Sequence, residues 1–298
     1  DKLLPYCYLL TDILGKFNTK RYTYEEIATN SIMYTGGIAF NVRALSDTNN
    51  ADDYKICFSL KAKVLMENLS KLFDILQAVA LESDLTDVKR FQELVGEVKT
   101  DWDSSFFNRG QAVAISRLYA YCSAAARVNE QDQFTYYQFL KDLADNFAEK
   151  GAEALEVLRG LLGQFFQNTC YMLAYSCDED LQEELRKAAL NFTEQLPQSE
   201  IAGKAPNVIP LGEVNEGITT AGKVQYVVAG GNFLKHGHKF TGAMRVLETI
   251  LRYEYLWTKI RIQGGAYGAT ARFDSNGLGI FASYRDPKLA ESLEAYYD

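Results

Sequence analysis

Histidine is the scarcest reactive residue in this sequence: its 298 residues include only two, His236 and His238. A zinc enzyme, or a Ser or Cys hydrolase with a histidine base, would have to use these two residues or borrow from another chain. They alternate as HxH, a spacing that can supply two metal ligands. No Cys, Asp or Glu follows them until Glu248, and Lys235 and Lys239 flank them. The pattern favours an exposed loop, with a metal site as the alternative.

Other shortages exclude further classes of protein. Lys and Arg total 31 against 39 Asp and Glu, a net charge of −8, which argues against a nucleic-acid-binding surface. No apolar run approaches the roughly 18 residues of a membrane-spanning helix, and no signal peptide is present. The sequence opens on Asp1 rather than Met, which predicts an excised fragment. The odd number of cysteines indicates reduced thiols in a cytosol-like compartment (Cys7, Cys57, Cys122, Cys170 and Cys177).

Proline is also rare, and its distribution predicts the domain boundary. Three of the five prolines fall within fourteen residues, near Gly203 and Gly212 (Pro197, Pro206 and Pro210). Clustered Pro and Gly between periodic segments mark a linker. A chain of this length suggests about two domains. We therefore expect an α/β domain with extra helices over 1–196, a linker over 197–213 and a partial α/β domain over 214–298.

The first domain reads mainly as helix, because apolar residues recur close to the 3.6-residue period. The predicted helices are Leu85–Thr100, Ala112–Val128, Phe134–Phe147, Ala152–Phe166 and a helix from Asp178 to Phe192. The short apolar run Thr169–Tyr175 predicts a strand. Alternating residues predict a hairpin of Gly37–Leu45 with Tyr54–Ala62, and in the second domain a hairpin of Gly265–Phe273 with Gly279–Tyr284. The Asn276-Gly277 step in the second turn is a strong hairpin signal.

The two hairpins look like copies of one unit. Each copy begins with a helical stretch, Leu4–Gly15 or Thr241–Tyr255, reaches a Gly-Gly pair and ends with a helix, Val64–Leu76 or Lys288–Tyr296. A further strand is expected over Lys223–Ala229. The fold class is therefore α+β, with two related domains. Each is expected to have an antiparallel-rich sheet with helices packed on one face, and the second copy is truncated.

The most specific local motif is RIQGGAYGA, residues 261–269. With an amphipathic helix before it and a hairpin after it, this motif resembles the C-terminal half of pitrilysin/insulinase-type zinc metallopeptidases, in particular the presequence-protease subgroup. The resemblance covers nearly the whole chain. It implies four similar α/β domains in two halves that close like a clamshell around peptides. In that arrangement 1–196 resembles the third domain and 214–298 the start of the fourth.

The resemblance also implies where the metal chemistry lies. Zinc in this family is held by an inverted HxxEH motif on a helix of the first domain, and its central Glu activates water. The corresponding helices here, Leu9–Leu14 and Ala243–Glu248, contain no histidine. Zinc is thus expected in the N-terminal half of the parent enzyme and not in this fragment, which alone is expected to be inactive.

Arg261 and Tyr267 are the candidate catalytic residues. They stand six residues apart across a glycine pair, so a sharp turn can bring a cation and a phenol together. The resemblance implies that such a pair reaches the substrate's backbone carbonyl near the metal, where both groups suit the developing oxyanion. Substrate binding is expected at Gly264, Gly265 and Ala266. The alternative is a surface ion pair of Arg261, with Tyr267 packed at a sheet edge.

Two further patterns have simpler interpretations. The glycines at 264, 265 and 268 echo a phosphate-binding loop, but they follow a helix and open a strand, the reverse of the order required. Close approach of the backbone to a substrate or to a neighbouring sheet is the better account. Asp101 and Asp103 flank Trp102 and suggest paired acids, but a helix-terminal turn is favoured.

The sequence thus predicts the non-catalytic C-terminal half of a zinc-dependent peptidase of oligopeptides or unfolded peptides. Its partners would be peptides and the N-terminal half of the same polypeptide, with neither nucleic acid nor membrane. Its compartment would be a bacterial cytoplasm, or an organelle matrix in a eukaryote. The alternative is a catalytically inactive homologue that acts as a structural, assembly or peptide-binding subunit.

Overall fold

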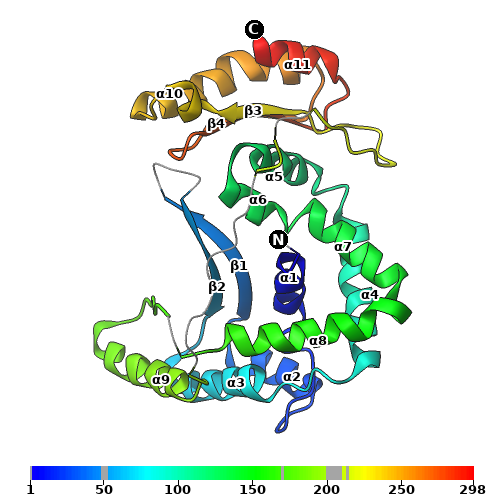
Figure 1. Ribbon diagram of the computed structural model, residues 1–298. Helices are drawn as coiled ribbons and strands as arrows, with labels where there is room; N and C mark the ends of the chain where they lie inside the picture. Colours follow the sequence, from blue (N-terminus) through cyan, green and yellow to red (C-terminus); the bar gives the residue numbers. More distant parts are fainter. Residues whose placement is uncertain (1, 48–52, 169–170, 199–209, 213–214) are drawn as a thin grey trace.

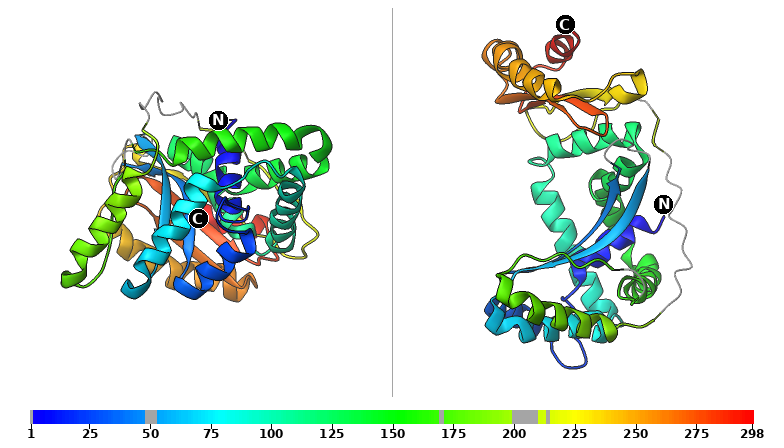
Figure 2. Two further views of the ribbon diagram at one scale, coloured as in Figure 1. Left: turned by 90° about the horizontal axis from the view of Figure 1, so that it is seen from below. Right: turned by 90° about the vertical axis from the view of Figure 1, so that its left-hand side faces the viewer.

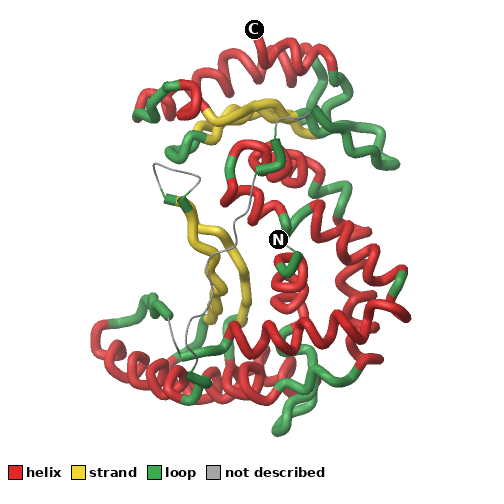
Figure 3. The backbone as a smooth tube through the Cα atoms, in the orientation of Figure 1, coloured by secondary structure: helices red, strands yellow, loops and turns green. Residues whose placement is uncertain are grey.

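The computed structural model describes residues 2–47, 53–168, 171–198, 210–212 and 215–298. Over these ranges two small antiparallel sheets are set among many helices (Figure 1 and Figure 3). The fold is α+β, as predicted. Within the same ranges, no helix combines the length and the apolar character that crossing a membrane requires.

The N-terminal sheet is a long hairpin. Strand β1 (Ile38–Ser46) pairs antiparallel with β2 (Tyr54–Ala62), with Ile38 opposite Ala62 at one end and Ser46 opposite Tyr54 at the other. Helix α1 (Leu4–Ile13) lies beside β1, and its apolar side chains are almost completely buried. The alternation of residues and the polar turn correctly predicted this hairpin.

Helices lie along one side of this hairpin and near its two ends (Figure 1). Their apolar faces build one large core with α1, centred on fully buried residues such as Phe91, Leu140 and Leu158. The helices are α2 (Tyr24–Tyr34), α3 (Leu69–Glu82), α4 (Val88–Ser105), α5 (Gly110–Cys122), α6 (Ala124–Glu130), α7 (Phe134–Asp145), α8 (Phe147–Phe165) and α9 (Gln182–Glu194), with short 3-10 turns η1 (Met66–Asn68) and η2 (Glu179–Leu181).

The C-terminal sheet has three antiparallel strands in the order β3-β5-β4. They are β3 (Val228–Asn232), β4 (Gly268–Phe273) and β5 (Leu278–Tyr284), and a 3-10 turn η3 (Phe233–His236) follows β3. One face of the sheet is covered by α10 (Gly242–Ile250), its continuation η4 (Leu251–Gln263) and α11 (Ala290–Tyr297) (Figure 1). Leu256, Ile260 and Tyr296 form a second, smaller core there.

The opposite face of this sheet rests on α5, so the two parts of the chain are in contact (Figure 1 and Figure 2). The packing is close: a Cβ at Gly110, the first residue of α5, would lie 2.3 Å from the Tyr226 ring. Gln111 Nε2 donates to Ser283 O across the interface at 3.3 Å. The C-terminal sheet therefore has its own helices on one face and α5 on the other.

Several expected elements differ in the structure. The predicted strand at 169–175 is absent from 171–175, where Met172 is 90% exposed and no strand pairs with the segment; residues 169–170 lie outside the described ranges. A short apolar run cannot by itself distinguish a strand from another structure. The expected helix over 112–128 is two helices, because Ser123 is extended and caps α6, its side chain accepting from the Ala126 N–H at 3.3 Å.

Other differences concern boundaries. The strand expected over 223–229 begins later, at Val228, and Gln225 makes only an isolated bridge with Asp286. The helix expected to end at residue 255 continues as a π-helix to Gln263. Of the predicted linker at 197–213, residues 199–209 and 213 are outside the described ranges, Pro206 and Gly203 among them. The Leu211 N–H, which is described, donates to Ala120 O of α5 at 3.0 Å.

Candidate functional site

The candidate site lies where η4 ends and β4 begins. Helix η4 is a π-helix of 13 residues, and π-helical segments are rare and are frequent at functional sites. The turn after it is tight: the Gly265 N–H donates to Arg261 O at 3.0 Å, and the Ala266 N–H donates to Ile260 O at 3.1 Å. These bonds satisfy carbonyls that the end of a helix would otherwise leave without donors.

Glycine is required at two positions of this turn. Gly265 has a φ of +84°, a left-handed conformation that L side chains rarely adopt. A Cβ at Gly264 would lie 2.4 Å from Ile260 O, inside the closest approach of real atoms. Ala266, by contrast, is buried in the C-terminal core. The turn therefore fixes the direction in which the chain leaves η4.

The turn brings Arg261 and Tyr267 together. Arg261 Nη1 donates to the backbone carbonyl of Tyr267 at 2.6 Å, and the guanidinium carbon lies 5.7 Å from the centre of the Tyr267 ring. The Tyr267 ring is 68% exposed and packs edge-on against Tyr284 at a centroid distance of 6.1 Å. The side chain is anchored at its base, because the Tyr267 N–H donates to Tyr284 O at 3.0 Å.

The alternative interpretation expects Tyr267 to pack at a sheet edge and Arg261 to form a surface ion pair, and the structure shows only the first of these. Tyr267 does pack at the edge of the sheet, beside Tyr284. In the part of the chain that the structure describes, however, no carboxylate lies within 4.0 Å of Arg261. A guanidinium offers five N–H donors, and Arg261 gives one hydrogen bond within this described part. The remaining donors and the Tyr267 hydroxyl can serve an oxygen atom brought to this surface.

The sequence analysis missed one member of the site, Trp257. Its ring lies under the Arg261 guanidinium, with 4.2 Å from the guanidinium carbon to the ring centre. An arginine stacked on an aromatic ring keeps its charge and its fork of donors while its mobility falls. The signal in the sequence is the four-residue spacing, which places Trp257 and Arg261 on one side of a helix.

The other candidates have structural roles. His236 ends the turn η3, and Gly237 follows in a left-handed conformation with φ +83°. Asp103 lies within α4, where Lys99 and the Tyr137 hydroxyl donate to it at 2.6 and 2.7 Å. The hydrogen bond from Lys99, followed by the bond from Tyr137, lowers the pKa of Asp103 below its usual value. Asp101 and Asp103 thus lie near the end of a helix, and the contacts of Asp103 are structural.

Cys7, Cys57 and Cys177 are free thiols, and all three are partly buried, as is Cys122. Burial raises the pKa of Cys7 to about 11. Cys170 is outside the described residues. Across the described ranges, no three His, Cys, Asp or Glu side chains are grouped to hold a metal ion. Those residues therefore do not fit the zinc that the resemblance implies for the parent protein.

Comparison with known proteins places these observations in a context. Residues 1–143 match a peptidase-associated family of the pitrilysin type, subfamily C, and residues 215–298 match the family "PreP C-terminal domain". The chain is 29% identical over 297 residues to Protein HypA of Clostridium perfringens. It is 26% identical over 301 residues to Presequence protease 1, chloroplastic/mitochondrial, of Arabidopsis thaliana. It is 24% identical over 307 residues to Presequence protease, mitochondrial, of Saccharomyces cerevisiae.

These three alignments each cover 99% of this chain, but only 30%, 27% and 31% of the respective relatives. The chain thus spans less than a third of the length of the curated relatives it matches. Among solved structures, the first half of the periplasmic protease PqqL from Escherichia coli aligns over 99% of this chain and 62% of that chain. The TM-score is 0.46 and the sequence identity 14%, a likeness too low to define the fold.

Proposed function

Since the chain corresponds to part of the C-terminal half of a pitrilysin-type peptidase of the presequence-protease subgroup, we propose that it forms a substrate-binding wall of the peptidase chamber. In this proposal Arg261 and Tyr267 contact the substrate's backbone carbonyl and stabilise the oxyanion that forms during hydrolysis. Gly264 and the exposed Gly265 present a backbone edge to the peptide, and the buried Ala266 supports this substrate-binding turn from the core. The whole protein would act on oligopeptides or unfolded peptides.

One observation carries the proposal: the turn at 264–266 brings an arginine and an exposed phenol together. Arg261 is held from two sides, by the Trp257 ring and by the Tyr267 carbonyl, so its position is fixed before a substrate arrives. Donors that are fixed in advance stabilise a developing negative charge without reorganisation at the moment of reaction. Within the described residues the Tyr267 hydroxyl has no hydrogen-bond partner, so it is available to a substrate oxygen.

The remaining functions belong to the rest of the parent protein. We propose that its N-terminal half binds the zinc ion, which activates the attacking water, and that the present chain contributes no metal ligand. We further propose that 1–196 and 214–298 are separate domains, which agrees with two hydrophobic cores and two sheets. The proposed location is a bacterial cytoplasm, or an organelle matrix in a eukaryote.

The test uses the full-length protein that contains this chain. Tyr267→Phe removes one hydroxyl and leaves the ring packed on Tyr284. Loss of one oxyanion donor lowers kcat by about 10²–10³-fold, so we expect a fall of that order in peptide hydrolysis. Arg261→Lys keeps the charge but loses the fork of donors, so this variant should retain only part of the wild-type activity. Tyr297→Phe, at an 84% exposed tyrosine of α11, is the matched control and should leave kcat unchanged.

Melting temperature is measured on the same samples, because a packing role would appear there instead. If Tyr267→Phe is folded and turns over peptide at the normal rate, the oxyanion role is wrong. If the full-length protein also cleaves no peptide with zinc present, the alternative of a structural or assembly subunit replaces the enzyme.

A further inference from the structure

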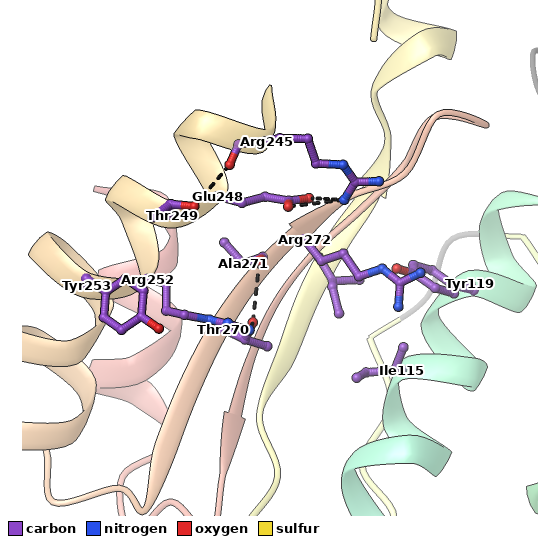
Figure 4. Close-up of a pocket in the computed structure, with 11 residues that line it drawn as sticks. Ile115, Tyr119, Arg245, Glu248, Thr249, Arg252, Tyr253, Thr270, Ala271 and Arg272 are labelled. Carbon is purple, nitrogen blue, oxygen red and sulfur yellow. Dashed lines mark hydrogen bonds and ion pairs between the residues drawn. The ribbon is translucent and has the colours of Figure 1, made fainter. Parts of the chain in front are cut away.

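A pocket that is separate from the Arg261–Tyr267 turn lies between the two parts of the chain. It is enclosed by α10 and the start of η4 on one side, β4 in the middle and α5 on the other side (Figure 4). Its volume is about 370 Å³. Pockets of this size, at the junction of two cores, are common places for small ligands or parts of larger ones.

Positive charge dominates the lining. Arg245 and Arg252 lie about two turns apart on the α10–η4 helix, and Arg272 comes from β4. Glu248 is the one carboxylate among the described lining residues (Figure 4). The lining residues carry an excess of two positive charges, of which the Asp274 carboxylate beside Arg272 offsets one. The positive charge that remains contrasts with the net charge of −8 of the whole chain. Such a local reversal of sign favours a negatively charged ligand.

The partners of these side chains show which charge remains available. Glu248 accepts from Arg245 Nη1 at 2.9 Å and also from the Phe273 N–H, so its carboxylate is fully engaged. Arg272 pairs with Asp274 at 2.9 Å.

Arg252 is different. Its one hydrogen bond among the described residues goes to a neutral hydroxyl, Thr270 Oγ1, at 2.8 Å, and no carboxylate of those residues lies within 4.0 Å of it. Arg252 therefore lines the pocket with an uncompensated charge and further N–H donors.

The remaining wall combines apolar surface with one unused polar atom. Ile115, Ala271 and Ile280 provide the apolar part. The hydroxyl of Tyr119 is shielded from solvent and finds no hydrogen-bond partner of normal geometry among the described residues. Burial and then the nearby Asp274 carboxylate raise the pKa of Tyr119, and Arg272, which extends toward the hydroxyl, lowers it (Figure 4). A buried polar group without a partner is costly unless a ligand or water supplies one. An apolar wall next to guanidinium groups suits a carboxylate attached to a hydrocarbon side chain.

We propose that this pocket binds a carboxylate group of a peptide, with Arg252 as its principal donor and Arg272 as the second. The carboxylate comes from the C-terminus of the peptide or from an Asp or Glu side chain. The inference rests on the proposed function, because a chamber that takes up peptides exposes this pocket to such groups. It assigns a site that is distinct from Arg261 and Tyr267.

The test measures binding to the whole 298-residue chain by fluorescence anisotropy, with three N-terminally labelled alanine-rich hexapeptides. One has a free C-terminus, the second is its C-terminal amide and the third is an amide with one internal Glu. We expect one or both carboxylate peptides to bind and the uncharged amide to bind at least about tenfold more weakly, since a hydrogen bond to a charged group is among the stronger ones. The first and third peptides distinguish the C-terminus from the side chain as the source.

Three variants make the test specific to the pocket. Arg252→Gln should weaken carboxylate binding by about tenfold or more. Arg272→Gln, which leaves the bond between Arg252 and Thr270 in place, should weaken it less and serves if Arg252→Gln fails to fold. Arg186→Gln, at an exposed arginine of α9, is the matched control and should bind normally.

Two results would overturn the proposal. The first is equal binding of all three peptides, or of none. The second is normal carboxylate binding by folded Arg252→Gln and Arg272→Gln variants. Failure of the proposed function is distinguishable, because Tyr267→Phe tests turnover in the full-length protein and should leave binding at this pocket unchanged.

Discussion

The turn between η4 and β4 can be tested glycine by glycine, because its three glycines differ in what a methyl group would meet. At Gly264 a Cβ would lie 2.4 Å from Ile260 O, so the backbone at the end of η4 would have to move. At Gly265 the nearest atom, Pro287 Cγ, is at an ordinary 3.6 Å, and only the φ of +84° opposes alanine. At Gly268 no atom lies within 4 Å and φ is not positive.

These differences set an order of stabilities. Overpacking against atoms that cannot easily move costs about 1–3 kcal/mol, so we expect Gly264→Ala to lose that much unfolding free energy. A left-handed conformation costs a non-glycine residue roughly 1–2 kcal/mol, which is the expected loss for Gly265→Ala. Gly268→Ala should change stability by no more than about 0.5 kcal/mol, as for most surface substitutions. It is the matched control.

Urea unfolding followed by tryptophan fluorescence provides the assay. The chain has two tryptophans, Trp102 in the N-terminal core and Trp257 in η4. In a Trp102→Phe background the remaining signal reports on the C-terminal core alone, which avoids the assumption that both cores unfold together. The slope of free energy against urea must stay constant for the midpoints to be compared. A loss at Gly268→Ala as large as the loss at Gly264→Ala would refute the reasoning.

Three further predictions use other parts of the chain. Glu130 is fully buried and pairs with Arg117 and Arg127 at 3.3 and 2.6 Å; Glu130→Ala should therefore lower the urea-unfolding free energy by about 3–5 kcal/mol, and a loss under about 1 kcal/mol would contradict this. Burial, only partly opposed by the hydrogen bond from Tyr136, raises the pKa of Asp12. The native state thus holds this proton more tightly than the unfolded chain, so the unfolding free energy should fall as pH rises above about 4, and Asp12→Asn should flatten that fall. The 298-residue chain alone should hydrolyse no peptide with or without added zinc; zinc-dependent, chelator-sensitive cleavage by the purified chain would place the metal site in this chain.

Local patterns in the sequence predicted much of the secondary structure. The hairpins formed because alternating residues and polar turns specify strand pairing over a short distance. A local signal was also overlooked: Thr23 and Glu26 form a reciprocal capping box at the start of α2, a helix that the sequence analysis did not include. The expectation at 171–175 was wrong because the run lacks a strand partner, which local sequence does not specify.

The sites were less predictable. The proximity of Arg261 and Tyr267 was predictable because the two residues are close in the sequence and share a turn; their catalytic role is a proposal. The arginine pocket was missed because Tyr119, Arg252 and Arg272 come from α5, η4 and β4, and their proximity depends on how the C-terminal sheet packs on α5. The π-helical hydrogen bonding of η4 also has no recognised signal in the sequence, and it determines where Trp257 lies relative to Arg261.

Comparing the two Gly-Gly turns, Gly36-Gly37 and Gly264-Gly265, distinguishes residues that the backbone conformation requires from residues that a binding site would require. The second glycine of each pair has a positive φ, +115° at Gly37 and +84° at Gly265. A glycine in this conformation therefore precedes a strand in each part of the chain. The positions that correspond to Arg261 and Tyr267 in the first turn, three residues before and two residues after the pair, are Met33 and Ala39. The glycines alone are therefore explained by the turn. The cation and the phenol are present at one turn and not at the other, so they need an explanation beyond folding, and the proposed contact with substrate supplies one.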